Sequence, residues 1–180
     1  GIAKKWVSPP FSCDGWRLDV AADLGHSEAY NHRFWKKFRK AVKEANEDAV
    51  ILAEHYGNPS AWLKGQEWDS IMNYDAFMEP VSWFLTGMEK HSDRAEPEKF
   101  GDGELFFNTM RYNMAKLPEN ALDAAMNQLS NHDHSRFLTR TNRRAGRMKD
   151  GFDDAGIGID YGLFRLASML LFTWPGAPTL

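Results

Sequence analysis

The chain has 180 residues, with 22 Lys and Arg against 25 Asp and Glu, so its formal net charge is −3 at pH 7. A composition of 43% hydrophobic and 13% aromatic residues excludes intrinsic disorder, and the length suits one domain with a sizeable core. The longest apolar stretch, 166–174, is interrupted by Ser168 and Thr173 and is too short to cross a bilayer, so we expect no membrane contact.

The chain carries one cysteine, Cys13, which cannot form an internal disulfide and supplies no multi-thiolate metal site. We therefore expect Cys13 to be inert. Residues 1–12 contain Lys4 and Lys5 but no central apolar segment, so no secretory signal is visible. The location stays open, with the cytoplasm favoured.

The first half of the chain alternates short apolar runs with amphipathic segments, which is typical of a parallel sheet with crossover helices. A strand is predicted over 15–20, and a helix with apolar positions three and four apart over 29–46. An uninterrupted, β-branched run predicts a strand buried on both faces over 49–53. A short helix over 60–63 and a weaker strand over 70–73 follow, so the predicted fold class is α/β.

The second half continues this alternation with more helix than strand. A polar segment rich in Gly, Pro and charge interrupts it and is interpreted as a surface excursion. The predicted elements are a helix over 74–85, the excursion over 87–103, helices over 104–115 and 119–126, a strand over 127–130, a loop with some helix over 139–158, a helix over 161–172 and the start of a strand over 177–180.

Polar residues follow three of the predicted strands. Asp19 ends the first strand, Glu54 the second, and 131–133, with sequence Asn-His-Asp, follow the fourth. In parallel α/β proteins the site lies at the carboxyl ends of the strands. We therefore expect the carboxylates of Asp19, Glu54 and Asp133 to converge on one face.

Two carboxylates that face each other across a cleft can cleave a glycosidic bond, one as nucleophile and the other as proton donor. Arg17 lies two residues before Asp19, so on a strand both side chains point to the same side and the guanidinium favours an ionised Asp19. Glu54 follows four apolar residues, and an apolar surrounding would keep it protonated until it donates its proton. The residue pattern thus fits a nucleophile at Asp19 and a general acid at Glu54.

Several other side chains suit a sugar site. His132 and Asp133 offer directional hydrogen bonds to sugar hydroxyls, and His55 and Tyr56 are placed to meet the leaving-group sugar. Aromatic rings also pack against the apolar faces of pyranoses. We assign four of the seven tryptophans to the core rather than to the site, namely Trp35, Trp62, Trp68 and Trp83.

Four segments resemble motifs of the alpha-amylase family, glycoside hydrolase family 13. GWRLDVA at 15–21 is similar to the family's strand-four motif, VILAE at 50–54 to its strand-five motif, LSNHD at 129–133 to its strand-seven motif, and FTWPGAPT at 172–179 to its passage into strand eight. The resemblance covers nearly the whole chain. It implies a retaining hydrolase acting on α-glucosidic bonds of starch-like glucans or maltooligosaccharides. With Trp at position 16, the first motif is similar to that of the neopullulanase-like branch of the family.

The resemblance also implies a role for each site residue. Asp19 corresponds to the nucleophile, Glu54 to the acid/base and Asp133 to the transition-state stabiliser, with Arg17 and His132 in support.

The family's fold is a parallel (β/α) barrel of TIM type, and the resemblance places this chain at roughly strands four to eight. Residues 1–180 would then be a single partial catalytic-barrel domain, without counterparts of strands one to three or of the small inserted domain. The family's calcium ligands lie largely in those parts, so no metal site is carried over and calcium is expected only in a full-length parent. Unpaired strand edges predict a homo-oligomer or cover by the missing barrel half.

Other interpretations stay open. The isolated chain could be an inactive structural or carbohydrate-binding piece, and the parent could be a 4-α-glucanotransferase or an α-glucosidase. A histidine metal site would use His26, His32, His55 and His134, with the 132–134 triplet as a further motif, but a metal-free site is expected. Nucleic acid is excluded as a partner because the net charge is negative and no nucleic-acid motif occurs. A solvated loop is therefore expected for the basic run Arg140, Arg143, Arg144, Arg147 and Lys149.

Overall fold

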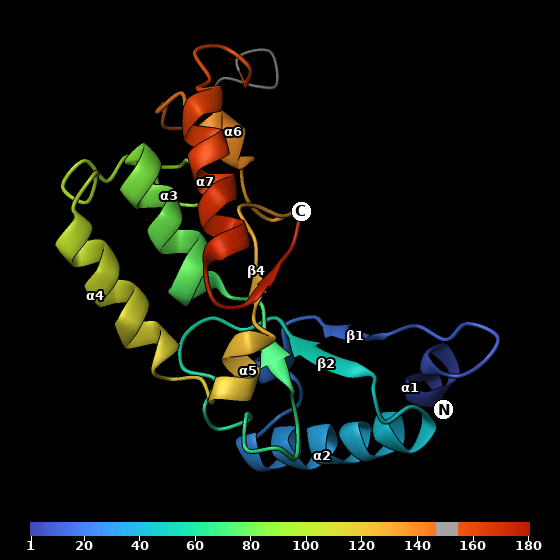
Figure 1. The fold of residues 1–180 in the computed structure, drawn as a ribbon. Helices are drawn as coiled ribbons and strands as arrows, with labels where there is room; N and C mark the ends of the chain where they lie inside the picture. The colour runs from blue at the N-terminus through green and yellow to red at the C-terminus, as the bar shows by residue number, and fades with distance from the viewer. Residues whose placement is uncertain (147–154) are drawn as a thin grey trace. The chain divides into compact units, whose positions relative to one another are not determined.

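The computed structural model describes residues 1–146 and 155–180, which divide into two compact units. Residues 1–72 and 116–126 form the first unit, and 73–115 with the described part of 127–180 form the second (Figure 1). The grouping of all 180 residues into one partial-barrel domain stays a prediction. No helix in the described ranges is long and apolar enough to cross a membrane.

The first unit is built around a parallel sheet of three strands in the order β1-β2-β3. Leu18 of β1 pairs with Ala53 of β2, and Ala53 pairs with Ile71 of β3. The elements of this unit are α1 (Ile2–Val7), β1 (Gly15–Leu18), the 3-10 helix η1 (Ala21–Asp23), α2 (Glu28–Ala45), β2 (Val50–Ala53), β3 (Ser70–Ile71) and α5 (Glu119–Asp123). The predicted parallel α/β pattern of the first half is thereby confirmed.

Helix α2 covers the sheet with its apolar stripe. Ser27 caps its first turn by accepting a hydrogen bond from the Tyr30 N–H at 3.2 Å. Trp35 and Val42 of α2 are buried in the same core cluster as Ile51 of β2. The predicted helix differs from the observed one by a single residue at each end, because the spacing of its apolar positions specifies the buried face.

The second unit is mainly helical. Helices α3, α4 and α7 lie side by side (Figure 1) and share a core that includes Val81, Phe106 and Leu171. Its elements are the π-helical turn η2 (Tyr74–Met78), α3 (Glu79–Thr86), α4 (Gly103–Met114), α6 (Phe137–Arg140), α7 (Tyr161–Thr173) and β5 (Ala177–Pro178). Asp102 and Asp160 cap α4 and α7 through their side chains. Strand β4 (Met126–Asn127) pairs with β5 where the two units join in the sequence.

Three predicted elements differ from the structure. Residues 60–63 form turns rather than a helix: the Trp62 N–H bonds to the Pro59 carbonyl at 3.0 Å, and Gly65 has a positive φ of 82°. In place of the strand expected over 127–130, the structure has only β4 (Met126–Asn127). The Asn127 side chain donates a hydrogen bond to the Pro175 carbonyl and so connects this strand to the C-terminal segment. The helix expected over 119–126 ends at Asp123.

The segment 87–103 is a surface excursion only in part. Residues 93–95, 97–98 and 100–102 are exposed, as its composition predicts, whereas Met88, Glu89, Ser92 and Glu96 are buried and Met88 forms an antiparallel bridge with Ala95. Glu96 is compensated locally, by Arg94 at 3.1 Å and by Lys99 at 3.0 Å. Charge content alone did not identify the buried residues of this segment.

Candidate active site

Two carboxylates follow the ends of adjacent parallel strands in the first unit. Because Leu18 pairs with Ala53, the next residues, Asp19 and Glu54, leave β1 and β2 at the same level. The structure thus places both predicted catalytic residues at the carboxyl edge of one sheet, where α/β proteins hold their sites.

Arg17 joins these two carboxylates. Its guanidinium forms an ion pair with the Asp19 carboxylate and lies 3.2 Å, Nη2 to Oε2, from Glu54. Its Nε faces the Met72 sulfur at 3.4 Å. The predicted Arg17–Asp19 pairing is present, and the contact with Glu54 is an addition that the sequence did not indicate.

The surroundings of the two carboxylates differ sharply. The Asp19 side chain is 77% exposed, whereas that of Glu54 is 11% exposed. The Glu54 carboxylate accepts a hydrogen bond from the Val20 N–H at 2.9 Å in addition to its contact with Arg17. The wholly apolar surrounding expected for Glu54 is therefore wrong: the strand before it is apolar, but a cation and a backbone donor hold its carboxylate.

The turn after Asp19 has an unusual backbone. Val20 adopts a left-handed conformation with φ 43° and ψ 45°, which is rare for a β-branched residue. This conformation aims the Val20 N–H at the Glu54 carboxylate, while the Ala21 N–H bonds to the Glu54 carbonyl at 3.4 Å. The turn is thereby attached to the end of β2. Strain of this kind concentrates at functional sites.

His55 and Tyr56 lie directly after Glu54. The His55 ring packs against Trp62 and Trp68, with ring centres 5.1 and 5.7 Å away, and these two indoles stack on each other at 4.7 Å. Tyr56 is 43% exposed. Trp68 is buried, as its assignment to the core predicts, and so are Trp35 and Trp83, whereas Trp62 is only half-buried.

The remaining two predicted site residues, His132 and Asp133, belong to the second unit. Their side chains are 3.4 Å apart, Nε2 to Oδ1, and both are exposed. The Asp133 N–H donates to the Asn131 side chain at 2.9 Å, so it is Asn131 that shapes this turn. The convergence of this group with Asp19 and Glu54 stays a prediction.

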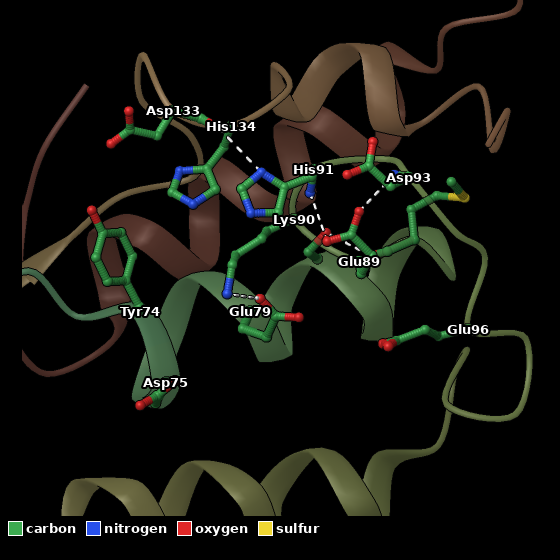
Figure 2. A network of polar contacts seen from close by, with 12 residues as sticks. Tyr74, Asp75, Glu79, Glu89, Lys90, His91, Asp93, Glu96, Asp133 and His134 are labelled. Atoms are coloured by element: carbon green, nitrogen blue, oxygen red, sulfur yellow. Dashed lines mark hydrogen bonds and ion pairs between the residues drawn. The ribbon is translucent and has the colours of Figure 1, made fainter. Parts of the chain in front are cut away.

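Two histidines contact this turn: His134, which belongs to the 132–134 triplet, and His91, which the sequence did not link to it. Figure 2 shows the His91 ring beside His134, with ring centres 4.7 Å apart, and His91 Nδ1 lies 3.2 Å from the Asp133 carbonyl oxygen. His134 Nδ1 is 2.5 Å from the Asn131 side-chain oxygen. No sequence signal links His91 to Asp133, because their contact depends on the folded path of the 87–103 segment.

Arg140 is fully buried and ties several backbones together. Its guanidinium donates to the carbonyls of Leu129 and Lys90 and to the Ser82 hydroxyl. Burial lowers the pKa of Arg140 to about 10, an effect that Glu79 and Glu89 partly offset. The expectation of a solvated loop is therefore wrong for Arg140, and Arg143 lies over the Phe100 ring at 4.1 Å. Arg147 and Lys149 of the same run are outside the described residues.

The histidine metal hypothesis gains no support. In the ranges 1–146 and 155–180, no group of three or more His, Cys, Asp or Glu side chains is arranged to hold a metal ion. His32 instead bonds to the buried Glu67 at 2.8 Å. The expectation about calcium stays a prediction, and we derive no step through a metal.

Comparisons with known proteins agree with this geometry. The family model described as the alpha amylase catalytic domain matches residues 1–179. Neopullulanase 2 of Thermoactinomyces vulgaris is 35% identical over 179 residues, which are 99% of this chain and 24% of that protein. A cyclomaltodextrinase of a Bacillus species is 30% identical over 178 residues, 99% of this chain and 26% of that protein.

Solved structures show the same relationship. The debranching enzyme of Nostoc punctiforme superposes with a TM-score of 0.75 at 28% identity, covering 99% of this chain and 33% of that one. Cyclic alpha-maltosyl-(1→6)-maltose hydrolase of Arthrobacter globiformis gives a TM-score of 0.73 at 30% identity, with 99% and 32% covered.

The chain therefore spans 24% to 26% of these two curated relatives and about a third of the solved chains. The match extends over nearly every residue and includes the strand ends that carry Arg17, Asp19 and Glu54. The TIM-barrel class of this catalytic domain agrees with the parallel, in-register strands of the first unit. The chain belongs to the alpha-amylase family, glycoside hydrolase family 13.

Proposed function

We propose that this chain carries the reacting groups of a retaining glycoside hydrolase that acts on α-glucosidic bonds of starch-like glucans or maltooligosaccharides. The observation that carries the proposal is the Arg17–Asp19–Glu54 constellation at the ends of β1 and β2. The names of the relatives support the substrate class: they are a neopullulanase, a cyclomaltodextrinase and a maltogenic alpha-amylase. The equivalence of the observed strands to strands four to eight of a barrel is part of the proposal.

The sheet register supports a retaining mechanism. Neighbouring strands lie about 4.8 Å apart, so side chains that leave adjacent strands at one level start at that separation. Retaining glycosidases need carboxyl groups about 5–5.5 Å apart, whereas inverting ones need about 6.5–9.5 Å to fit a water molecule. Asp19 and Glu54 follow the register pair Leu18–Ala53, which favours the shorter separation.

In the first step, an Asp19 oxygen attacks the anomeric carbon as the glycosidic bond breaks, and Glu54 gives its proton to the departing oxygen. A glycosyl-Asp19 ester and a shortened glucan result. In the second step, Glu54 takes a proton from water, the water oxygen bonds to the anomeric carbon, and Asp19 leaves as carboxylate. Two inversions at the same carbon retain the anomeric configuration.

Arg17 and the second unit would assist these steps. The Arg17 guanidinium pairs with Asp19 and would orient its carboxylate for the attack. The exposed side chains of His132 and Asp133 offer hydrogen bonds to sugar hydroxyls that strengthen as the ring flattens in the transition state. Tyr56, exposed directly after Glu54, is suited to pack against the leaving-group sugar.

The stereochemical outcome tests the proposal. We expect NMR of the full natural chain acting on maltotriose to show the α-anomer as the first-formed product, before mutarotation. A β-anomer formed first would exclude Asp19 as the nucleophile.

Substitution tests the two roles. Asp19→Asn should abolish turnover on all substrates, whereas Glu54→Gln should lower kcat/KM about 10²–10⁴-fold on maltotriose but far less on α-glucosyl fluoride, because kcat/KM reports the first step and fluoride leaves without a proton. Matched controls are Asp48→Asn and Glu98→Gln, which change exposed carboxylates away from the strand ends. Near-normal turnover by Asp19→Asn would contradict the proposal.

A further inference from the structure

One buried amide connects the turn after Asp19 with the loop after Glu54. Asn31, in the second turn of α2, is 2% exposed, and its Nδ2 lies 2.9, 3.0 and 3.0 Å from the carbonyl oxygens of Ala21, Ala22 and Leu24. Its Oδ1 accepts a hydrogen bond from Trp62 Nε1 at 2.8 Å. The Asn31 side chain thereby donates to one loop and accepts a hydrogen bond from the other.

The first of these loops acts directly on Glu54. The turn held by Asn31 contains the Val20 N–H that bonds to the Glu54 carboxylate at 2.9 Å and the Ala21 N–H that bonds to the Glu54 carbonyl at 3.4 Å. The strained left-handed conformation at Val20 needs such external support, because an isolated β-branched residue disfavours it.

The second loop acts on the residue next to Glu54. The Trp62 indole, fixed by Asn31, packs against the His55 ring at 5.1 Å and stacks on Trp68 at 4.7 Å. A movement of Trp62 would therefore shift the His55 ring and the end of β2. Trp35 adds a second donor to the same turn, its Nε1 lying 2.8 Å from the Ala21 carbonyl.

We propose that Asn31 is a positioning residue for the proposed reaction: its amide fixes the Glu54 carboxylate from both sides, through the turn of residues 20–24 and through Trp62. This inference rests on the proposed function, since it concerns the delivery of a proton by Glu54. Two neutral hydrogen-bonding ends in fixed orientation are needed, which is why neither Asp nor Leu would substitute.

The test uses Asn31→Asp in the full natural chain. This substitution keeps the shape and the acceptor for Trp62 but replaces the donor by an oxygen that the three carbonyls repel. We expect kcat on maltotriose to fall about 10- to 100-fold with KM changed less than about threefold. The loss of kcat/KM should be much smaller on α-glucosyl fluoride than on maltotriose, because kcat/KM reports the first step, in which fluoride leaves without the proton of Glu54.

The matched control is Asn113→Asp, which alters an amide that also bonds to two backbone carbonyls, those of Asp75 and Thr109, in the second unit. Its kcat should stay near that of the parent. If Asn31→Asp fails to fold, Trp62→Phe removes the indole N–H that bonds to Asn31, together with part of the ring surface against His55 and Trp68, and should give the same pattern on the two substrates.

The outcomes separate the two proposals. Equal losses of kcat/KM on both substrates, or a kcat on maltotriose within twofold of the parent, would overturn the role of Asn31 while leaving the function intact, provided that Asp19→Asn is inactive. An active Asp19→Asn would instead overturn the proposed function itself.

Discussion

Arg17 connects the two carboxylates on which the proposed chemistry depends. It pairs with the exposed Asp19 and the nearly buried Glu54 from a side chain that is itself 30% exposed. Arginine suits this position because its planar guanidinium presents several donors in a fixed fork, whereas lysine is a single point charge. A single guanidinium can therefore hold Asp19 and Glu54, the proposed nucleophile and acid, in one arrangement.

We expect Arg17→Lys to lower kcat/KM on maltotriose at least about 100-fold, since a lysine cannot hold both carboxylates at once. Folding should be almost unchanged, with the midpoint of urea unfolding near that of the parent. Arg165→Lys, at an exposed position of α7, is the control and should leave kcat/KM unaltered. Full activity of Arg17→Lys would show that the double contact is dispensable.

At the scale of elements, periodicity and strand-end chemistry predicted much of the first unit. The positions of β1, α2 and β2, and with them Arg17, Asp19 and Glu54, follow from apolar patterning alone. The contacts that orient Glu54 could not be predicted, because they depend on a left-handed Val20 and on a long-range amide from α2. Neither leaves a periodic trace in the sequence.

Prediction was weaker in the second unit. Composition placed segment 87–103 at the surface, whereas Glu89 and Glu96 within it are buried. The basic run after 139 contained Arg140, which the fold buries completely. Glu96 pairs with neighbours in the sequence and Arg140 bonds to distant backbone carbonyls, and a local charge count detects neither arrangement.

Helix α6 is attached to its surroundings mainly through Arg140, which reaches Ser82 of α3 and the carbonyls of Lys90 and Leu129. Since burial lowers the pKa of Arg140 to about 10, the unfolded chain holds this proton more tightly. The contribution of this group to stability therefore rises as pH passes upward from about 10, and at neutral pH these hydrogen bonds and the charges of Glu79 and Glu89 offset the cost of burying its charge.

We expect Arg140→Lys to lower the free energy of unfolding by about 3 kcal/mol at pH 7, since a lysine leaves buried acceptors unsatisfied. Urea unfolding followed by circular dichroism measures the change. Arg136→Lys, at an exposed neighbouring position, should stay within about 0.5 kcal/mol of the parent. A similar value for both variants would show that the buried contacts contribute little.

At the scale of the whole molecule, large apolar side chains are exposed to solvent on two helices of the second unit. Phe107 and Tyr112 of α4 are 51% and 68% exposed, and Met169 and Phe172 of α7 are 65% and 60% exposed. Large exposed apolar side chains of this kind favour association with another chain when they lie together. This chain spans only a part of its relatives, so the activity of the isolated chain needs its own test.

We expect the 180-residue chain, prepared alone, to associate and to show no turnover of maltotriose. Light scattering should give a mass above the 20.6 kDa of one chain, and a combined Met169→Lys and Phe172→Glu substitution should reduce it. A monomer that cleaves maltotriose would contradict both expectations and would make the 180 residues sufficient for the reaction.

The in-register pairing of β1 and β2 also affects how the site would assemble during folding. Asp19 and Glu54 are joined by one crossover containing α2, so few residues must be ordered to bring them together. Contacts between residues close in the sequence form early in folding, because they close short loops. The two carboxylates of the proposed reaction would thus come together when the first unit forms.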